Sequence, residues 1–321
     1  MNQTRASDAG DPSHCARVAQ AILHNVELVL KGKHQQVELA LAAMVAGGHL
    51  LIEDVPGLGK TMLARALAVS VGLSFKRIQF TADLMPSDIV GGPVYNPKDG
   101  SFFLRQGPVF ANIVLADEIN RASPRAQSAL LECMEEGQIT LDGQTVALPT
   151  PFAVLATQNP IDMAGTFPLP EAQLDRFLVR LSLGYPDIDT EAGLITMQQF
   201  AHPIGALRPV CAAGDFAALV EGARHVTITP EVGLFMASIV AATRKHPAIR
   251  FGASPRGTLG LARMARALSG LRGLSYVDPA VVREVAGPVL AHRLIVQTQG
   301  VQAKTAEALV QDILASQRTP Q

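Results

Sequence analysis

Hydrophobic positions along the first 185 residues follow two alternating patterns. Short continuous apolar runs at residues 50–52, 113–116 and 152–157 are typical of buried parallel strands. Between and before them, segments such as residues 16–30 and 124–136 carry apolar residues at helical spacing. Because strands that alternate with helices are joined by crossovers into a parallel sheet, this region is predicted to be an α/β domain.

From residue 186 onward the pattern contains only helical periodicity. The predicted helices lie near residues 189–201, 215–224, 230–245, 255–271, 279–293 and 305–317. We therefore expect three parts in the chain. They are a disordered polar lead over residues 1–15, an α/β domain over residues 16–185 and an all-helical domain over residues 186–321.

Two hairpins are predicted to interrupt the α/β domain. A helix at residues 83–90 is ended by the glycines and proline of residues 91–93, and turn-forming residues 96–100 then separate two short apolar runs. A second pair of alternating strands, between residues 138 and 148, flanks an Asp-Gly turn. Insertions of this kind carry function more often than scaffold.

Composition narrows the classes of function. The 321 residues carry a formal net charge of -1, which gives no reason to expect nucleic acid as a partner. No apolar run reaches the ~18 residues that span a bilayer. The polar first residues also lack the pattern of a secretory signal, so we expect a cytoplasmic protein without membrane insertion. Three cysteines lie far apart in sequence, which favours neither disulfides nor zinc.

The run from Asp54 to Thr61, DVPGLGKT, joins the first predicted strand to a helix and is typical of a P-loop. Gly57 and Gly59 allow backbone N–H groups to turn toward phosphate oxygens. Lys60 can reach the β- and γ-phosphates of a nucleotide, and the Thr61 hydroxyl can bind Mg²⁺. Asp54 stands where the motif has its first glycine, so a glycine-rich turn without a ligand remains an alternative for this loop taken alone.

Two carboxylates follow the apolar strand at residues 113–116. Nucleotide sites lie at the carboxyl ends of parallel strands. Asp117 is therefore predicted to hold Mg²⁺ together with Thr61, and Glu118 to orient and polarise an attacking water. An Asp-Glu step at a strand end is also common as a helix cap or a solvated turn, but the P-loop and the buried strand before it favour the catalytic interpretation.

Three further residues could act on the phosphates. Asn159 ends the strand expected beside that of Asp117, where its amide could hold the water or the γ-phosphate. Alternatively, it is a turn-forming Asn before Pro. Arg176 and Arg256 could stabilise the charge that phosphoryl transfer spreads over the equatorial oxygens, if a neighbouring subunit or domain delivers them. A single Arg is more often part of a surface salt bridge.

Six segments resemble, in order and wording, the MoxR family of AAA+ ATPases. The matching segments are EDVPGLGKT, LMPSDIVGG, GPVFANIVLADEINRASPRAQSALLECMEEGQIT, LATQNP, GTFPLPEAQLDRF and ASPRGT. The resemblance runs from about Ala16 to the C-terminus and includes Asp54, since the family commonly lacks the first glycine of the P-loop. It implies an AAA+ parallel sheet core flanked by helices, in which nucleotide binds, followed by an all-helical lid domain.

The resemblance also implies roles for individual residues. Asp117 and Glu118 correspond to the Walker B carboxylates, Asn159 to sensor 1, Arg176 to the arginine finger and Arg256 to sensor 2. Residues 91–110 correspond to a helix-2 insert and residues 138–149 to a pre-sensor hairpin. The implied nucleotide contacts are Val55, Pro56, Gly57, Leu58, Gly59, Lys60, Thr61 and Met62 of Walker A, with Val29, Leu30 and Gly32 beside the adenine. The sequence at residues 30–33, LKGK, departs there from the usual Val-Gly-Gln.

By the same resemblance, the chain is expected to hydrolyse ATP with Mg²⁺ as a homo-oligomeric ring, a hexamer. Such rings remodel protein clients in a chaperone-like way, mature them or insert metals and cofactors, together with a von Willebrand factor A domain partner. Two alternatives stay open, namely a nucleotide-switched scaffold with little turnover and a DNA-acting motor. The near-neutral charge and the absence of a dense Lys/Arg set in the hairpins argue against the motor.

Overall fold

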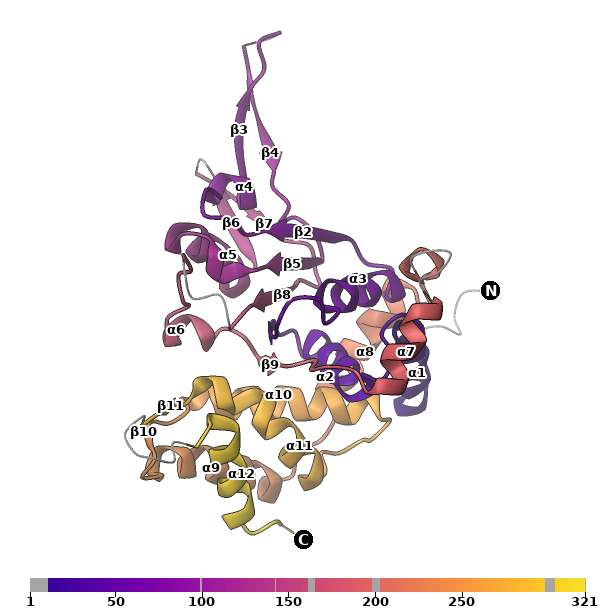
Figure 1. The fold of residues 1–321 in the computed structure, drawn as a ribbon, viewed down its shortest axis with the longest axis vertical. Coiled ribbons are helices and arrows are strands. Elements are labelled where there is room, and N and C mark those ends of the chain that lie inside the picture. The colour runs from indigo at the N-terminus through magenta and orange to yellow at the C-terminus, as the bar shows by residue number, and fades with distance from the viewer. Residues whose placement is uncertain are drawn as a thin grey trace.

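The computed structural model describes residues 11–98, 100–141, 143–160, 165–197, 203–297 and 304–320 (Figure 1). Residues 1–10 of the predicted lead, one residue in each predicted hairpin turn (99 and 142) and the end of a predicted helix at residues 198–201 lie outside these ranges. The helix expected from Ala16 begins earlier, at Pro12, where Asp11 accepts a hydrogen bond from the backbone N–H of Ser13 as its N-cap.

Five parallel strands form the central sheet in the order β2-β5-β8-β1-β9, so the predicted α/β fold class is confirmed. The strands are β2 (Phe75–Gln79), β5 (Ile113–Asp117), β8 (Ala153–Gln158), β1 (Leu50–Glu53) and β9 (Val179–Leu181). Every residue of β5 and β8 is buried, which explains their continuous apolar sequence. Because all five strands are parallel, their carboxyl ends meet at one edge.

Alternating side chains of the sheet feed two hydrophobic cores, one on each face. Leu50 and Ile52 of β1 belong to one core, whereas Leu51 belongs to the other. The first core is covered by α1 (Pro12–Glu27), α2 (His34–Val45) and α3 (Lys60–Ser70), and it continues into the C-terminal helices. The second core is covered by α4 (Pro86–Val90) and α5 (Pro124–Glu136). The sheet is therefore covered on both faces, and the carboxyl ends of its strands form the edge where the P-loop lies.

Both predicted hairpins are present. β3 (Gly91–Tyr95) pairs with β4 (Phe102–Gln106) and projects away from the sheet, while β6 (Gln138–Leu141) pairs with β7 (Gln144–Ala147) (Figure 1). A Cβ atom on Gly91 would lie 2.0 Å from a backbone oxygen of β4, so the base of the first hairpin admits only glycine there. The helix predicted at residues 83–90 is shortened to α4, because its first residues form a turn.

The C-terminal part is mostly helical. Its helices are α7 (Ile188–Met197), α8 (Ala213–His225), α9 (Pro230–Lys245), α10 (Pro255–Leu271), α11 (Pro279–Leu290) and α12 (Ala306–Ser316). Helices α9 to α12 lie beneath the sheet, and α7 and α8 lie beside α1 (Figure 1). One detail of the all-helical prediction was wrong, because β10 (Ile249–Phe251) and β11 (Ile295–Val296) form a small antiparallel sheet. Strands of two or three residues are too short for a period-two pattern to be recognised.

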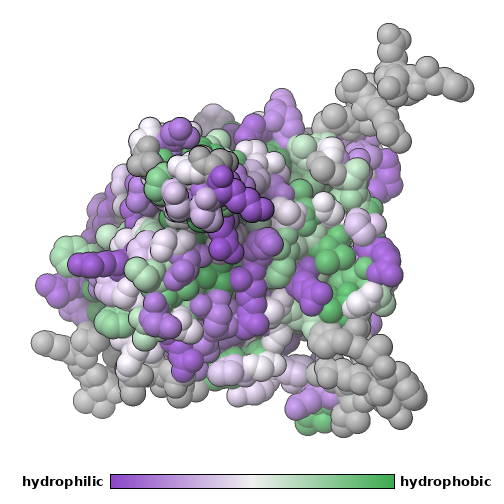
Figure 2. Space-filling model, turned by 90° about the horizontal axis from the view of Figure 1, so that it is seen from above, coloured by the Kyte–Doolittle hydropathy of each residue, from purple (hydrophilic) through white to green (hydrophobic). Residues whose placement is uncertain are grey.

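Surface properties agree with the composition. Seen from the hairpin end, hydrophilic and hydrophobic residues alternate over the molecule in small areas (Figure 2). Within the described ranges, no helix combines the length and the apolar composition needed to cross a bilayer.

The domain boundary predicted near residue 185 stays a prediction, since helix α8 beyond it contacts α1 and α2 as well as α10.

Candidate active site

The P-loop connects β1 to α3 at the carboxyl edge of the sheet. Gly57 and Gly59 have φ angles of 88° and 92°, a region that favours glycine, and α3 begins directly afterwards at Lys60. The first N–H groups of a helix have no partner inside it, and together with the helix dipole they attract anions. The loop thus has the backbone geometry and the position of a phosphate-binding turn.

Asp54, the departure from the usual motif, has a structural explanation. Its backbone does not adopt a positive φ, so glycine is not required at this position. Its carboxylate is buried and accepts hydrogen bonds from the Ser182 hydroxyl (2.7 Å) and from the backbone N–H groups of Leu183 and Gly184. Asp54 therefore fastens the start of the P-loop to the chain that leaves β9.

Lys60 is held at the strand ends by two carbonyl groups. Its ammonium donates to the backbone oxygens of Asp54 (2.5 Å) and Gln158 (3.4 Å). Burial lowers the pKa of Lys60, while the nearby carboxylates of Asp54, Asp117 and Glu118 act in the opposite direction. The cation therefore lies at the carboxyl ends of β1 and β8.

Asp117 is the last residue of β5 and its carboxylate is strongly anchored. The Thr157 hydroxyl donates to one oxygen at 2.6 Å, and Arg77 donates to the other at 2.6 and 3.0 Å. No group of three or more His, Cys, Asp or Glu side chains converges on a metal position in the described part of the chain. This donor set suits Mg²⁺, which is usually bound by one or two carboxylates, water and substrate phosphates.

Glu118 has an unusual backbone. Its φ and ψ are 58° and 49°, and it is the one non-glycine residue in the described ranges with a positive φ. Its N–H donates to the Thr157 hydroxyl at 2.8 Å, and its carboxylate accepts from Gln79 (3.0 Å) and Arg121 (3.1 Å). A left-handed conformation in a charged residue costs energy and is concentrated at functional sites. Gln79 was not predicted from the sequence. It lies opposite Asp117 because β2 pairs with β5.

Asn159 follows β8 and is buried. The expectation that this strand lies beside β5 is confirmed by the pairing of Ala116 with Ala156. Asn159 is two residues beyond Thr157, which contacts both Asp117 and Glu118. The amide therefore lies at the same sheet edge as the two carboxylates.

The segment expected beside the adenine packs against the P-loop. A Cβ atom on Gly59 would lie 2.9 Å from Cδ1 of Leu30, so these two residues are in close contact. Gly32 has a φ of 68°, and Lys33 donates to the backbone oxygen of Tyr185 at 2.8 Å. The chain just before α7 therefore forms a wall next to this segment, and Tyr185 is a neighbour that sequence reasoning did not include.

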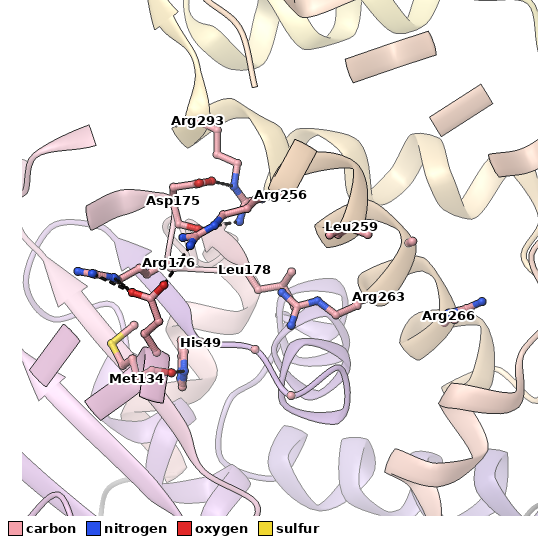
Figure 3. A pocket seen from close by; sticks show the side chains of 14 residues that line it. His49, Met134, Asp175, Arg176, Leu178, Arg256, Leu259, Arg263, Arg266 and Arg293 are labelled. Carbon is pink, nitrogen blue, oxygen red and sulfur yellow. Dashed lines mark hydrogen bonds and ion pairs between the residues drawn. The ribbon is translucent and has the colours of Figure 1, made fainter. Parts of the chain in front are cut away.

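Arg176 and Arg256 meet at a separate place, a cavity of about 560 Å³ between the sheet domain and α10 (Figure 3). Glu135 at the end of α5 joins them, with one carboxylate oxygen 2.9 Å from Nε of Arg176 and the other 3.0 Å from Nη2 of Arg256. The hydrogen bond from Arg176, followed by that from Arg256, lowers the pKa of Glu135. No residue from Asp54 to Met62, all of which are described, lines this cavity.

The cavity carries more positive charge than the sequence indicated. Arg263, Arg266 and Arg293 also line it, against the two carboxylates of Glu135 and Asp175 (Figure 3). Burial lowers the pKa of Arg263, which reflects a guanidinium partly removed from water. The seven-residue spacing from Arg256 to Arg263, two helical turns, could have placed both on one face of α10.

Comparisons with known proteins identify the family of the chain. A family model described as "ATPase family associated with various cellular activities (AAA)" matches residues 49–179, and an AAA lid domain model matches residues 241–313. The chain is 39% identical to Chaperone MoxR1 of Mycobacterium tuberculosis over 93% of this chain and 81% of that protein. The chain belongs to the MoxR family of AAA+ ATPases. It is accordingly an ATPase, as the sequence predicted.

Other relatives of this MoxR-family ATPase match over nearly the whole chain. The uncharacterized protein YeaC of Bacillus subtilis is 47% identical, covering 94% of this chain and 95% of its own length. A crystal structure of a candidate ATPase from Cytophaga hutchinsonii, 35% identical, superposes with a TM-score of 0.89 over 98% of both chains. The predicted AAA+ core and C-terminal lid are thereby confirmed.

Proposed function

We propose that this ATPase hydrolyses ATP at the interface of two protomers, with the P-loop edge of one facing the arginine cavity of the next. The observation that carries this proposal is the separation of the two regions. Arg176 and Arg256 converge on Glu135 in a cavity that contains no P-loop residue. Each protomer then supplies the nucleotide-binding half of one site and the arginine half of another, a head-to-tail arrangement that a closed ring satisfies for every protomer.

The P-loop half binds the nucleotide. Residues from Val55 to Met62 surround the phosphates, all but Pro56 offering a backbone N–H group, and Lys60 exchanges its carbonyl partners for phosphate oxygens. Leu30, packed against Gly59, lies beside the adenine together with Val29 and Gly32. Thr61 and Asp117 would hold Mg²⁺, Asp117 mostly through water because both of its oxygens already accept hydrogen bonds. When bound, Mg²⁺ neutralises charge on the phosphates.

Glu118 is assigned as the residue that orients and polarises the attacking water. Its carboxylate is held by Gln79 and Arg121 rather than buried in an ion pair with Lys60, so it remains available to a water molecule. Asn159 supplies a neutral amide for the water or the γ-phosphate. Arg176 and Arg256 of the adjacent protomer stabilise the charge on the equatorial oxygens.

The biological output is proposed to be chaperone-like work on a protein client. One relative bears the name Chaperone MoxR1, which supports this class of activity. The β3–β4 hairpin exposes the aromatic side chains of Tyr95, Phe102 and Phe103, which supports contact with another protein. We propose a cytoplasmic hexameric ring with a von Willebrand factor A domain partner, acting in maturation or in metal or cofactor insertion.

The interface model is tested by mixing two inactive variants. Arg176→Ala should bind ATP normally and lose on the order of 10³- to 10⁵-fold in turnover, the range known for arginine fingers in GTPases. Glu118→Gln should also be inactive but retains a sound arginine. Mixed under conditions of confirmed subunit exchange, the two should recover part of the activity. If the mixtures stay as inactive as the parents, Arg176 does not act in trans.

A further inference from the structure

The short segment that carries Arg176 is held by the lid. Arg293, in the turn η3 (Ala291–Arg293), donates from Nε to the carboxylate of Asp175 at 2.7 Å. Its Nη2 donates to the backbone oxygens of Asp175 (3.3 Å) and Phe177 (2.7 Å). One guanidinium therefore contacts the residues on both sides of Arg176. With a side chain only 4% exposed, Arg293 is a buried structural cation rather than a surface charge.

Two more lid groups complete this contact. Nε2 of His292 lies 2.9 Å from the backbone oxygen of Phe177, and burial lowers the pKa of His292 to about 3. The imidazole is therefore neutral at physiological pH, and its Nε2–H donates the hydrogen bond. The Ser254 hydroxyl, two residues before Arg256, lies 3.5 Å from the second carboxylate oxygen of Asp175. Asp175 is thus gripped by η3 and by the start of α10.

We infer that Arg293, together with His292, is a positioning residue that lets the lid set the direction of Arg176. This inference rests on the proposed function, because it assigns Arg176 to the neighbouring protomer's nucleotide. Arg256 and Arg176 would then move as one unit with the lid, Arg256 directly on α10 and Arg176 through Asp175 and Phe177. A displacement of about 1 Å in a positioning group can cost on the order of 100-fold in rate.

The test uses the full-length oligomer and two variants, Arg293→Gln and Asp175→Asn. Each should lower kcat by roughly 10- to 100-fold, while the affinity of its own P-loop for ATP, measured by calorimetry, stays unchanged. Mixing either variant with Glu118→Gln should restore turnover, because the defect lies on the arginine side. In an Arg176→Ala background, Arg293→Gln should add no further loss. Arg293→Lys, which keeps the charge but not the fork of donors, serves if the Gln variant does not fold.

Arg272→Gln provides a matched control. Arg272 also joins the lid to the sheet domain, pairing with Glu38 of α2 (2.7 Å) and Glu284 of α11 (2.8 Å), but it does not contact residues 175–177. Arg272→Gln should lower the melting temperature of the protein. It should not cause the fall in kcat that Glu118→Gln subunits rescue. If Arg272→Gln loses as much kcat as Arg293→Gln and Glu118→Gln subunits rescue that loss, general loosening of the lid explains the effect. The inference would then be overturned.

The two proposals fail separately. Wild-type turnover in Arg176→Ala would overturn the interface model itself. If Arg176→Ala is inactive while folded Arg293→Gln and Asp175→Asn turn over like wild type, Arg176 keeps its role and the positioning inference is wrong. It is also wrong if Glu118→Gln subunits rescue Arg176→Ala but not Arg293→Gln.

Discussion

The P-loop edge and the arginine cavity are built in different ways. At the P-loop edge, Asp117 and Glu118 lie at the end of β5, and Lys60, the first residue of α3, contacts carbonyl groups at the ends of β1 and β8. All three are fixed by contacts at one edge of the sheet. In the cavity, Arg176 and Arg256 come from two domains and are joined through one carboxylate, Glu135. The first region is preorganised in the single chain. In the second, our proposal is that Glu135 is a temporary partner of the two arginines, which act on the nucleotide of a second protomer.

This difference predicts where each variant fails. Glu118→Gln removes the carboxylate but keeps the size of the side chain and much of its hydrogen bonding, so binding should survive while turnover falls by roughly 10² to 10⁴. The protein should accumulate as an ATP-bound ring. Single-turnover hydrolysis and size-exclusion chromatography with ATP measure the two properties. Near-normal hydrolysis in this variant would mean that another residue at this edge of the sheet orients the attacking water.

Lys60→Ala should act on binding instead. A charge-assisted contact with a phosphate contributes about 1.5–3 kcal/mol, so its removal should weaken ATP binding by roughly 10- to 100-fold. No other cation described at the P-loop edge contacts the carbonyl oxygens that hold Lys60, so none is positioned to replace it. Isothermal titration calorimetry measures the affinity, and Lys76→Ala, which replaces an exposed lysine of β2, is the control. If Lys60→Ala and Lys76→Ala bind ATP with equal affinity, Lys60 does not contact the phosphates.

The same difference explains what the sequence could predict. The P-loop, Asp117 and Asn159 were predictable because local patterns identify buried strands, and the residues directly after them must meet at one edge. The contact of Glu135 with Arg176 and that of Arg293 with Asp175 were not predicted, because they join residues 41 and 118 positions apart in the sequence. Gln79 was only partly predictable. Its strand was identified from the sequence, but its place opposite Asp117 depends on the pairing of β2 with β5.

Glu135 gives the finest test of the comparison. It bridges Arg176 and Arg256 in the single chain, yet its side chain is 38% exposed, and ion pairs in such positions contribute about 0–1 kcal/mol. If the nucleotide of the next protomer replaces this carboxylate, Glu135→Gln should change turnover by no more than about fivefold, far less than Arg176→Ala.

The measurement is steady-state ATP hydrolysis at several salt concentrations, with Glu132→Gln of the same helix as the matched control. Salt screens the exposed pairs that Glu135 makes, so the difference between wild type and Glu135→Gln should shrink as ionic strength rises. A loss as large as that of Arg176→Ala would mean that Glu135 itself contacts the reacting groups. The cavity would then be a second centre that is preorganised in the single chain, and Arg176 and Arg256 would not need a second protomer.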